Sequence, residues 1–154
     1  RLTVNVTVPV SAGLLIETDR YFAALGAYRR GEPDAIVELG AAAALEAVRN
    51  GRQLAGEVAD ARADWNVKLR SVRSDSVVWK IVDTLIERPV IDAASVSERH
   101  GVTTTAARTA INRMVDAGVL RQANAGLRFR KWIAVDVATA LDRFADRAGR
   151  RGNA

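Results

Sequence analysis

Residues 91–132 carry two short helical patterns that meet at a single glycine. Asp92 can cap the first helix, because its carboxylate accepts hydrogen bonds from the free amides of a first turn. Gly101 follows, and glycine reaches the left-handed backbone conformation that a tight turn between helices needs. Thr103 or Thr104 can cap the second helix, whose apolar side chains recur at three- and four-residue spacing. The pattern predicts two helices joined by a short turn, each with one face in a shared core.

Strand-forming sequences flank these two helices. Residues 120–123 and 127–134 are expected to be strands, joined by a turn at residues 124–126. Val90 and Ile91 can form a small further strand that pairs with this ribbon. The sequence therefore predicts a small β-ribbon packed against the helix pair.

One further helix is expected before this arrangement and one after it. Residues 77–86 form a strongly amphipathic pattern that Pro89 ends, and Val137, Leu141 and Phe144 mark a closing helix. This order of helices and strands is typical of a winged helix-turn-helix. The predicted fold is therefore mainly α: an N-terminal helical segment, followed by a winged helix-turn-helix with a three-helix core and a small β-wing.

Positive charge is concentrated in the same region. Residues 99–131 hold seven arginine and lysine side chains against one acid, Asp116, a local net charge of +6, while the whole chain carries +5. Residues 1–73 carry a net charge of +1 and residues 74–154 a net charge of +4. A basic face on such a fold is the electrostatic footprint of nucleic-acid binding. The pattern favours double-stranded DNA as a partner.

The second helix of the pair is the candidate recognition helix. Its outward face presents Thr104, Thr105, Arg108, Thr109, Asn112 and Arg113. Arginine can pair with guanine and asparagine with adenine through two hydrogen bonds each, and threonine can touch a phosphate or a thymine methyl group. Residues near the N-terminal end of such a helix usually reach base edges, which favours the first four of these.

The wing supplies a second set of candidate contacts. They are Arg121, Arg128, Arg130 and Lys131. The second and third of these share a face of an extended chain, as residues that follow a DNA backbone would. The alternative is that both sets form a solvated polar surface on a winged helix that docks onto proteins. The sequence leaves DNA binding and docking open.

The first half is expected to be a separate helical segment, residues 1–72, ahead of a winged-helix domain at residues 73–154. Residues 2–10 alternate apolar and polar side chains, as a short strand or extended arm does. A long periodic stretch follows Pro33, interrupted by Asn50-Gly51, so one long helix and two stacked helices are both open. An alanine run at residues 41–44 lets a partner helix approach closely, as a core seam or as a homodimer seam.

Several chemistries lack their residues in this chain. There is no cysteine, which excludes disulfides, thiolate metal ligands and a cysteine nucleophile. The only histidine, His100, has no nucleophile and orienting group beside it, so we interpret it as the last residue of a helix. No glycine-rich phosphate loop, no ligand set with metal-site spacing and no membrane-spanning apolar stretch occurs. We expect no catalytic, cofactor-binding or metal site, no membrane partner and a cytoplasmic location.

Three segments of the first half follow one another in a recognisable order. A proline-serine segment precedes a tyrosine-rich helix, and a Gly-Glu-Pro-Asp sequence opens the long alanine-rich helix: residues 8–15, 21–29 and 31–37. This order resembles the part of Fic-family proteins that follows their catalytic motif. Many bacterial members then end in a winged helix like the one expected here, so the resemblance covers nearly the whole chain.

The resemblance implies a non-catalytic region of a protein AMP-transferase. The family's catalytic motif, a histidine followed by Pro-Phe, an acid and a Gly-Asn-Gly-Arg anion loop, is absent, and the residues after His100 do not match it. None of its roles can be carried over to this chain, and the family's ATP and divalent metal are implied only for the missing catalytic part. The arginine at position 1 fits a chain that begins just after the motif.

Three functional hypotheses remain open at this stage. The chain is the C-terminal region of a Fic-family protein whose winged helix binds DNA or regulates the catalytic domain. Alternatively, it is a freestanding winged-helix transcription regulator with a helical dimerisation arm. In the third hypothesis, the winged helix docks protein substrates or the protein's own catalytic domain.

Overall fold

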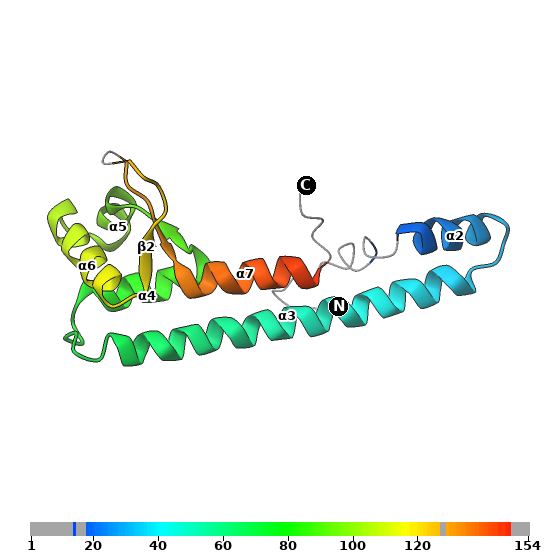
Figure 1. The fold of residues 1–154 in the computed structure, drawn as a ribbon, viewed down its shortest axis with the longest axis horizontal. Helices are drawn as coiled ribbons and strands as arrows, with labels where there is room; N and C mark the ends of the chain where they lie inside the picture. Colours follow the sequence, from blue (N-terminus) through cyan, green and yellow to red (C-terminus); the bar gives the residue numbers. More distant parts are fainter. Residues whose placement is uncertain (1–13, 15–17, 127–128, 149–154) are drawn as a thin grey trace. The chain divides into compact units, whose positions relative to one another are not determined.

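The computed structural model describes residue 14, residues 18–126 and residues 129–148. In these residues the protein is mainly helical, with one small antiparallel sheet of three strands (Figure 1). The helices are α2 (Thr18–Arg29), α3 (Asp34–Lys68), α4 (Val77–Glu87), α5 (Ala93–His100), α6 (Thr104–Asp116) and α7 (Val135–Arg147). The strands are β1 (Val90–Ile91), β2 (Leu120–Gln122) and β3 (Trp132–Ala134). The mainly α class predicted from the sequence is confirmed.

The chain forms two compact units. The central unit comprises Gly56–Ala140, and the flanking unit comprises the described residues up to Ala55 and from Leu141 onward. The division falls inside α3 and α7, so each of these helices contributes residues to both units. The domain boundary expected from the sequence after residue 72 stays a prediction.

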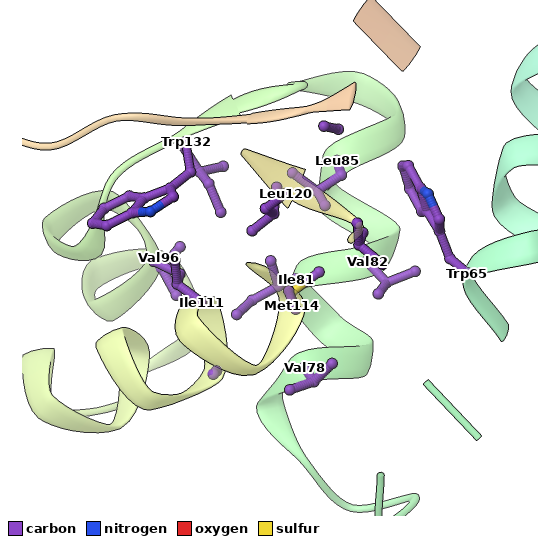
Figure 2. Close-up of a cluster of buried hydrophobic side chains, with 14 of the residues drawn as sticks. Trp65, Val78, Ile81, Val82, Leu85, Val96, Ile111, Met114, Leu120 and Trp132 are labelled. Carbon is purple, nitrogen blue, oxygen red and sulfur yellow. The ribbon is translucent and has the colours of Figure 1, made fainter. Parts of the chain in front are cut away.

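The hydrophobic core of the central unit lies where α4 meets α6. The apolar residues of α4 fall on one helical face, and four of them are buried: Val78, Ile81, Val82 and Leu85. Ile111 and Met114 of α6 are fully buried against this face. Figure 2 shows these side chains meeting in the middle of the cluster, with Trp132 of β3 on one side and Trp65 of α3 on the other.

The turn between α5 and α6 is fixed by the residues that the sequence pointed to. Asp92 caps α5: its Oδ1 accepts from Ser95 N at 2.8 Å, and the Ser95 hydroxyl oxygen accepts from Asp92 N at 3.2 Å. Gly101 ends α5 in the left-handed conformation, at φ +64°. Thr103 caps α6, because its hydroxyl oxygen accepts from Ala106 N at 3.1 Å.

The sheet has the order β1-β3-β2, with both pairings antiparallel. Ile91 of β1 and Gln122 of β2 both pair with Trp132 of β3. The pairing of Val90 and Ile91 with the ribbon, expected from the sequence, is confirmed. The expected extent of the two ribbon strands is wrong at residues 123 and 129–131, because β2 ends at Gln122 and β3 begins at Trp132, and the expected strand residues 127 and 128 lie outside the described residues.

The C-terminal end of α3 belongs to the central unit. Trp65 is fully buried, and its indole Nε1 donates to Asp136 Oδ2 at 2.8 Å. Lys68 Nζ lies 3.8 Å from the same carboxylate oxygen and 2.6 Å from Asp64 Oδ2. A buried aromatic ring whose N–H is satisfied fixes the end of α3 against the start of α7.

In the flanking unit, mostly small side chains form the buried face of α3: Leu39, Ala43, Ala47 and Asn50. The Asn50 side chain donates through Nδ2 to Phe144 O at 3.2 Å and accepts through Oδ1 from Arg147 Nε at 2.6 Å. Because these tertiary bonds use both ends of the amide, Asn50 does not compete for the helix backbone. Of the two alternatives left open at Asn50-Gly51, one continuous helix is therefore correct.

Some sequence expectations fall on residues that are not described. The strand or arm at residues 2–10 and the wing residue Arg128 lie outside the described residues. Within the described residues, no helix combines the length and the apolar character that crossing a membrane requires.

Candidate nucleic-acid interface

A groove of about 750 Å³ runs between the start of α5, the outer face of α6 and the loop that joins β2 to β3. Ala93, Ala94 and Trp132 also contribute to its lining. The residues that carry its chemistry are Thr104, Arg108, Asn112, Phe129, Arg130 and Lys131. We call this hollow the α6 groove. It brings together residues from the two candidate sets, one on α6 and one on the segment between β2 and β3.

Three of the predicted recognition-helix residues line the α6 groove. Thr104, Arg108 and Asn112 follow one another at four-residue spacing, so they form one stripe along α6. All three are exposed. The helix begins at Thr104, and the positive end of its dipole therefore lies at the same end of the groove.

Two threonines form a neighbouring stripe on the outer face. Thr105 and Thr109 are exposed but are not part of the groove lining. The Thr109 hydroxyl donates to Thr105 O at 3.1 Å. Because that bond uses its hydrogen, the Thr109 hydroxyl can only accept from an incoming ligand while the bond lasts.

Arg113 is the predicted recognition-helix residue that the structure places apart from the groove. Its Nη2 donates to Ser71 O at 3.1 Å. Position 113 lies about 100° further around the helix than Asn112, on the side that meets the segment between α3 and α4. Arg113 therefore tethers α6 to this segment.

The candidate residues of the predicted wing are likewise divided between positions that line the groove and positions that do not. Arg130 and Lys131 line the groove, whereas Arg121 is exposed on β2, opposite Ile133, and is not part of the lining. Arg128 lies outside the described residues. One carboxylate, Asp92, also lines the groove, but it is occupied in capping α5. Arg108, Arg130 and Lys131 thus place three cations around the groove against one engaged acid.

Side chains replace strand pairing in the loop between β2 and β3, which explains why the predicted strands were too long. Asn124 Nδ2 donates to Phe129 O at 3.1 Å, and its Oδ1 accepts from Lys131 N at 2.9 Å. Gln122 Nε2 donates to Asn124 O at 2.6 Å and to Gly126 O at 3.1 Å. Phe129 has a φ of +53°, which an extended strand does not allow.

Sequence reasoning missed Phe129 and the supporting roles of Gln122 and Asn124. Phe129 was not among the candidate residues, yet it is 91% exposed and lines the groove. The signal available in the sequence was Asn124, because asparagine beside a turn often bonds nearby backbone groups. No comparable signal marked the left-handed backbone at Phe129.

His100 is the last residue of α5, as expected. It lines a second hollow, of about 440 Å³, together with Thr84 and Arg99. Burial, with smaller contributions from the charges of Arg99 and Lys80, lowers the pKa of His100 below its ordinary value of 6.5. In the part of the chain that is described, no group of three or more histidine and acidic side chains is arranged to hold a metal ion.

Comparison with known proteins adds no assignment. The sequence matches no protein-family model and no curated protein. A functional proposal for this chain therefore depends on the geometry of the central unit. The resemblance to the Fic family stays a prediction.

Proposed function

We propose that the central unit is a winged helix-turn-helix that binds double-stranded DNA. The order α4, β1, α5, α6, β2 and β3 supports this fold, as does the left-handed turn at Gly101 between α5 and α6. The antiparallel sheet with β3 in the middle supports it too, because it makes the β2–β3 loop a wing beside α6. In such folds the second helix of the pair enters the major groove.

The stripe on α6 has the chemistry for reading base edges. Arg108 can donate two hydrogen bonds to O6 and N7 of a guanine, and Asn112 can form two with an adenine. The two residues are four apart, so they lie roughly 6 Å apart along the helix axis, close to two base-pair steps. Thr104 lies at the first turn, where a hydroxyl and the helix dipole suit a phosphate.

The proposal rests above all on three cationic side chains that line the α6 groove. Arg108 from α6 and Arg130 and Lys131 from the wing line the same groove although they are far apart in the sequence. Three cations on two elements match a polyanion that has a regular groove, because one element can enter the groove while the other follows the phosphates. A phosphate backbone meets this requirement directly.

The test is titration of the whole chain against a duplex at several salt concentrations. Salt-dependent binding is expected, and Arg130→Ala with Lys131→Ala should reduce the slope of log K against log salt by about 0.9 for each phosphate that is no longer neutralised. The matched control is Lys80→Ala with Arg88→Ala, which removes the same charge from exposed residues outside the α6 groove. Absence of binding at low salt, or an equal decrease of slope in the control, would rule the proposal out.

A further inference from the structure

We infer that Phe129 is a wedge that inserts between base pairs at the edge of the minor groove of bound DNA, so that the protein favours easily deformed base steps. This inference rests on the proposed function, since it names how the wing engages the same duplex. Phe129 has no charge, so binding of phosphates does not explain why its side chain is exposed in the α6 groove.

The ring of Phe129 is exposed to a degree that is unusual for a phenyl group. It is 91% exposed, the largest value among the exposed large hydrophobic side chains of the described residues. Keeping an aromatic ring in water is unfavourable, because burying its apolar surface lowers the free energy. The ring therefore has a strong driving force to be covered by a partner, and the groove beside it is where a partner would lie.

The backbone holds this exposed position at a conformational cost. Phe129 adopts φ +53°, and it is the only non-glycine residue with a positive φ among the residues described. Bulky side chains rarely adopt this conformation, and such outliers cluster at binding sites, where the surrounding structure enforces them. Asn124 holds the chain that follows this residue, because it bonds Phe129 O and Lys131 N on either side of Arg130.

The surroundings of the ring select the kind of partner. Arg130 and Lys131 follow Phe129 directly, and Arg108 lines the same groove. An occupant must therefore offer both negative charge and flat apolar surface. Duplex DNA combines the two, with phosphates at the groove edges and stacked base faces between them. Proteins that bind the minor groove often use apolar side chains as wedges that partly unstack a base step.

A wedge makes the energy of deforming the DNA part of the binding energy. Pyrimidine–purine steps such as TA unstack easily, whereas A-tracts are stiff. The protein should therefore prefer a duplex with a TA step at the position of the wing over an A-tract duplex of equal length and charge. This preference would arise without a hydrogen bond from Phe129 to any base.

The experiment compares these two duplexes with the full chain and its variants. We expect the unmodified protein to bind the TA duplex several-fold more tightly. Phe129→Asn, which removes the ring but tolerates the left-handed backbone, should weaken binding to the TA duplex by about five- to a hundredfold and abolish the preference. It should leave the salt slope unchanged, because the same phosphates stay neutralised. Phe129→Trp should keep the preference.

The control is Phe22→Ala, which removes another exposed phenyl ring, 61% exposed, from the flanking unit and should change neither affinity nor preference. Equal thermal unfolding midpoints would establish that the variants are folded. If Phe129→Asn binds both duplexes as the unmodified protein does, or is weakened by the same factor on both, the wedge is overturned while the proposed function stands. If the unmodified protein shows no salt-dependent binding to either duplex, the proposed function itself fails.

Discussion

Gly101 forms the turn between α5 and α6 in the left-handed backbone conformation, which residues with a Cβ rarely adopt. Its φ is +64°, and its N–H donates to Ser97 O, closing the C-terminal end of α5. A Cβ there would meet no atom within 4 Å, so the penalty of a substitution is conformational. We expect Gly101→Ala to lower the free energy of unfolding by about 1 kcal/mol, measured by urea denaturation.

Gly56 is the matched control for that change. It also has open space around its Cβ position, but it lies inside α3 and belongs to the same central unit. Because alanine is the better helix former, Gly56→Ala should raise the free energy of unfolding by about 0.5–1 kcal/mol. Two changes of the same sign would contradict the assignment of the Gly101 effect to its backbone conformation.

We expect His100 to make the free energy of unfolding depend on pH. The Thr84 hydroxyl donates to Lys80 O at 3.0 Å, and His100 Nε2 lies 3.4 Å from Thr84 Oγ1, so the tautomer protonated at Nε2 can donate to this oxygen. Since burial lowers the pKa of His100, the unfolded chain binds a proton more readily than the folded protein. The free energy of unfolding should therefore be highest above about pH 6.5 and fall as the pH decreases below it. Urea denaturation at a series of pH values measures this.

The variant His100→Gln separates this effect from the titration of carboxylates. Glutamine retains an N–H donor near the position of Nε2 but does not titrate. The stability of this variant should be nearly flat between about pH 7 and about pH 5.5, the range in which histidine titrates. A decline as steep as that of the unmodified protein would assign the effect to other groups.

Single residues also mark the limit of what the sequence could predict. The exposed face of α6 followed from its apolar period, and Thr104, Arg108 and Asn112 are on it as expected. The bond from Arg113 to Ser71 O could not be predicted, because it joins residues 42 apart in the chain. Local patterns specify which face of a helix is outward, but not which distant backbone group lies beside it.

Among the elements, helices were easier to predict than strands. Helix ends depend on local signals, and Asp92, Gly101 and Thr103 act as caps where the sequence placed them. Strand ends in the wing depend instead on competition between ladder hydrogen bonds and side-chain hydrogen bonds. In the described residues 123–126 and 129–131, hydrogen bonds from the side chains of Asn124 and Gln122 replace ladder bonds, apart from the bond of Ala123 N to Lys131 O at 2.8 Å.

Asn124 should therefore control the order of the wing. Asn124→Ala removes the bonds to Phe129 O and Lys131 N without touching β2 or β3. We expect the Lys131 amide to exchange its hydrogen faster, while amides within α6 keep their protection, since local opening follows the removal of local bonds. Hydrogen exchange followed by NMR measures both.

Asn124→Asp is the informative comparison for the wing. It keeps an acceptor for Lys131 N and replaces the donor to Phe129 O by a carboxylate oxygen, which cannot donate. Protection of the Lys131 amide should be largely retained in this variant. Fast exchange in both variants would mean that the donor bond alone orders the wing, and slow exchange in both would mean that other contacts do.

On the scale of the whole molecule, the two units differ in what the sequence could say about them. The central unit has helix-capping residues, core residues that recur at helical spacing and an excess of basic side chains. Its elements could therefore be predicted. The described part of the flanking unit buries mostly alanines, which leave a weak pattern, and the Fic family stays a prediction based on resemblance. Part of that resemblance falls on residues 8–13, which are not described. Labelled AMP transferred by the purified chain alone would contradict the prediction that this chain is a non-catalytic region of a Fic-family protein.

The distribution of buried side chains predicts that the two units unfold separately. Among the described residues, all of the largest fully buried side chains, from Trp65 to Val119, lie in the central unit, whereas the buried residues described for the flanking unit are three alanines, Leu39 and Asn50. Because stability follows buried apolar surface, the flanking unit should unfold at a lower urea concentration. The three tryptophans, Trp65, Trp79 and Trp132, all lie in the central unit.

Two spectroscopic signals can therefore resolve the two steps. Helical circular dichroism should show both transitions, whereas tryptophan fluorescence should report only the later one. Leu39→Ala, a large-to-small change that costs about 2–5 kcal/mol in a packed site, should move only the earlier transition. Coincidence of the two signals at every urea concentration, with both shifted together by Leu39→Ala, would instead mean that α3 and α7 couple the units into one cooperative structure. The continuity of both helices across the division makes that outcome a physical alternative, and the measurement separates the two directly.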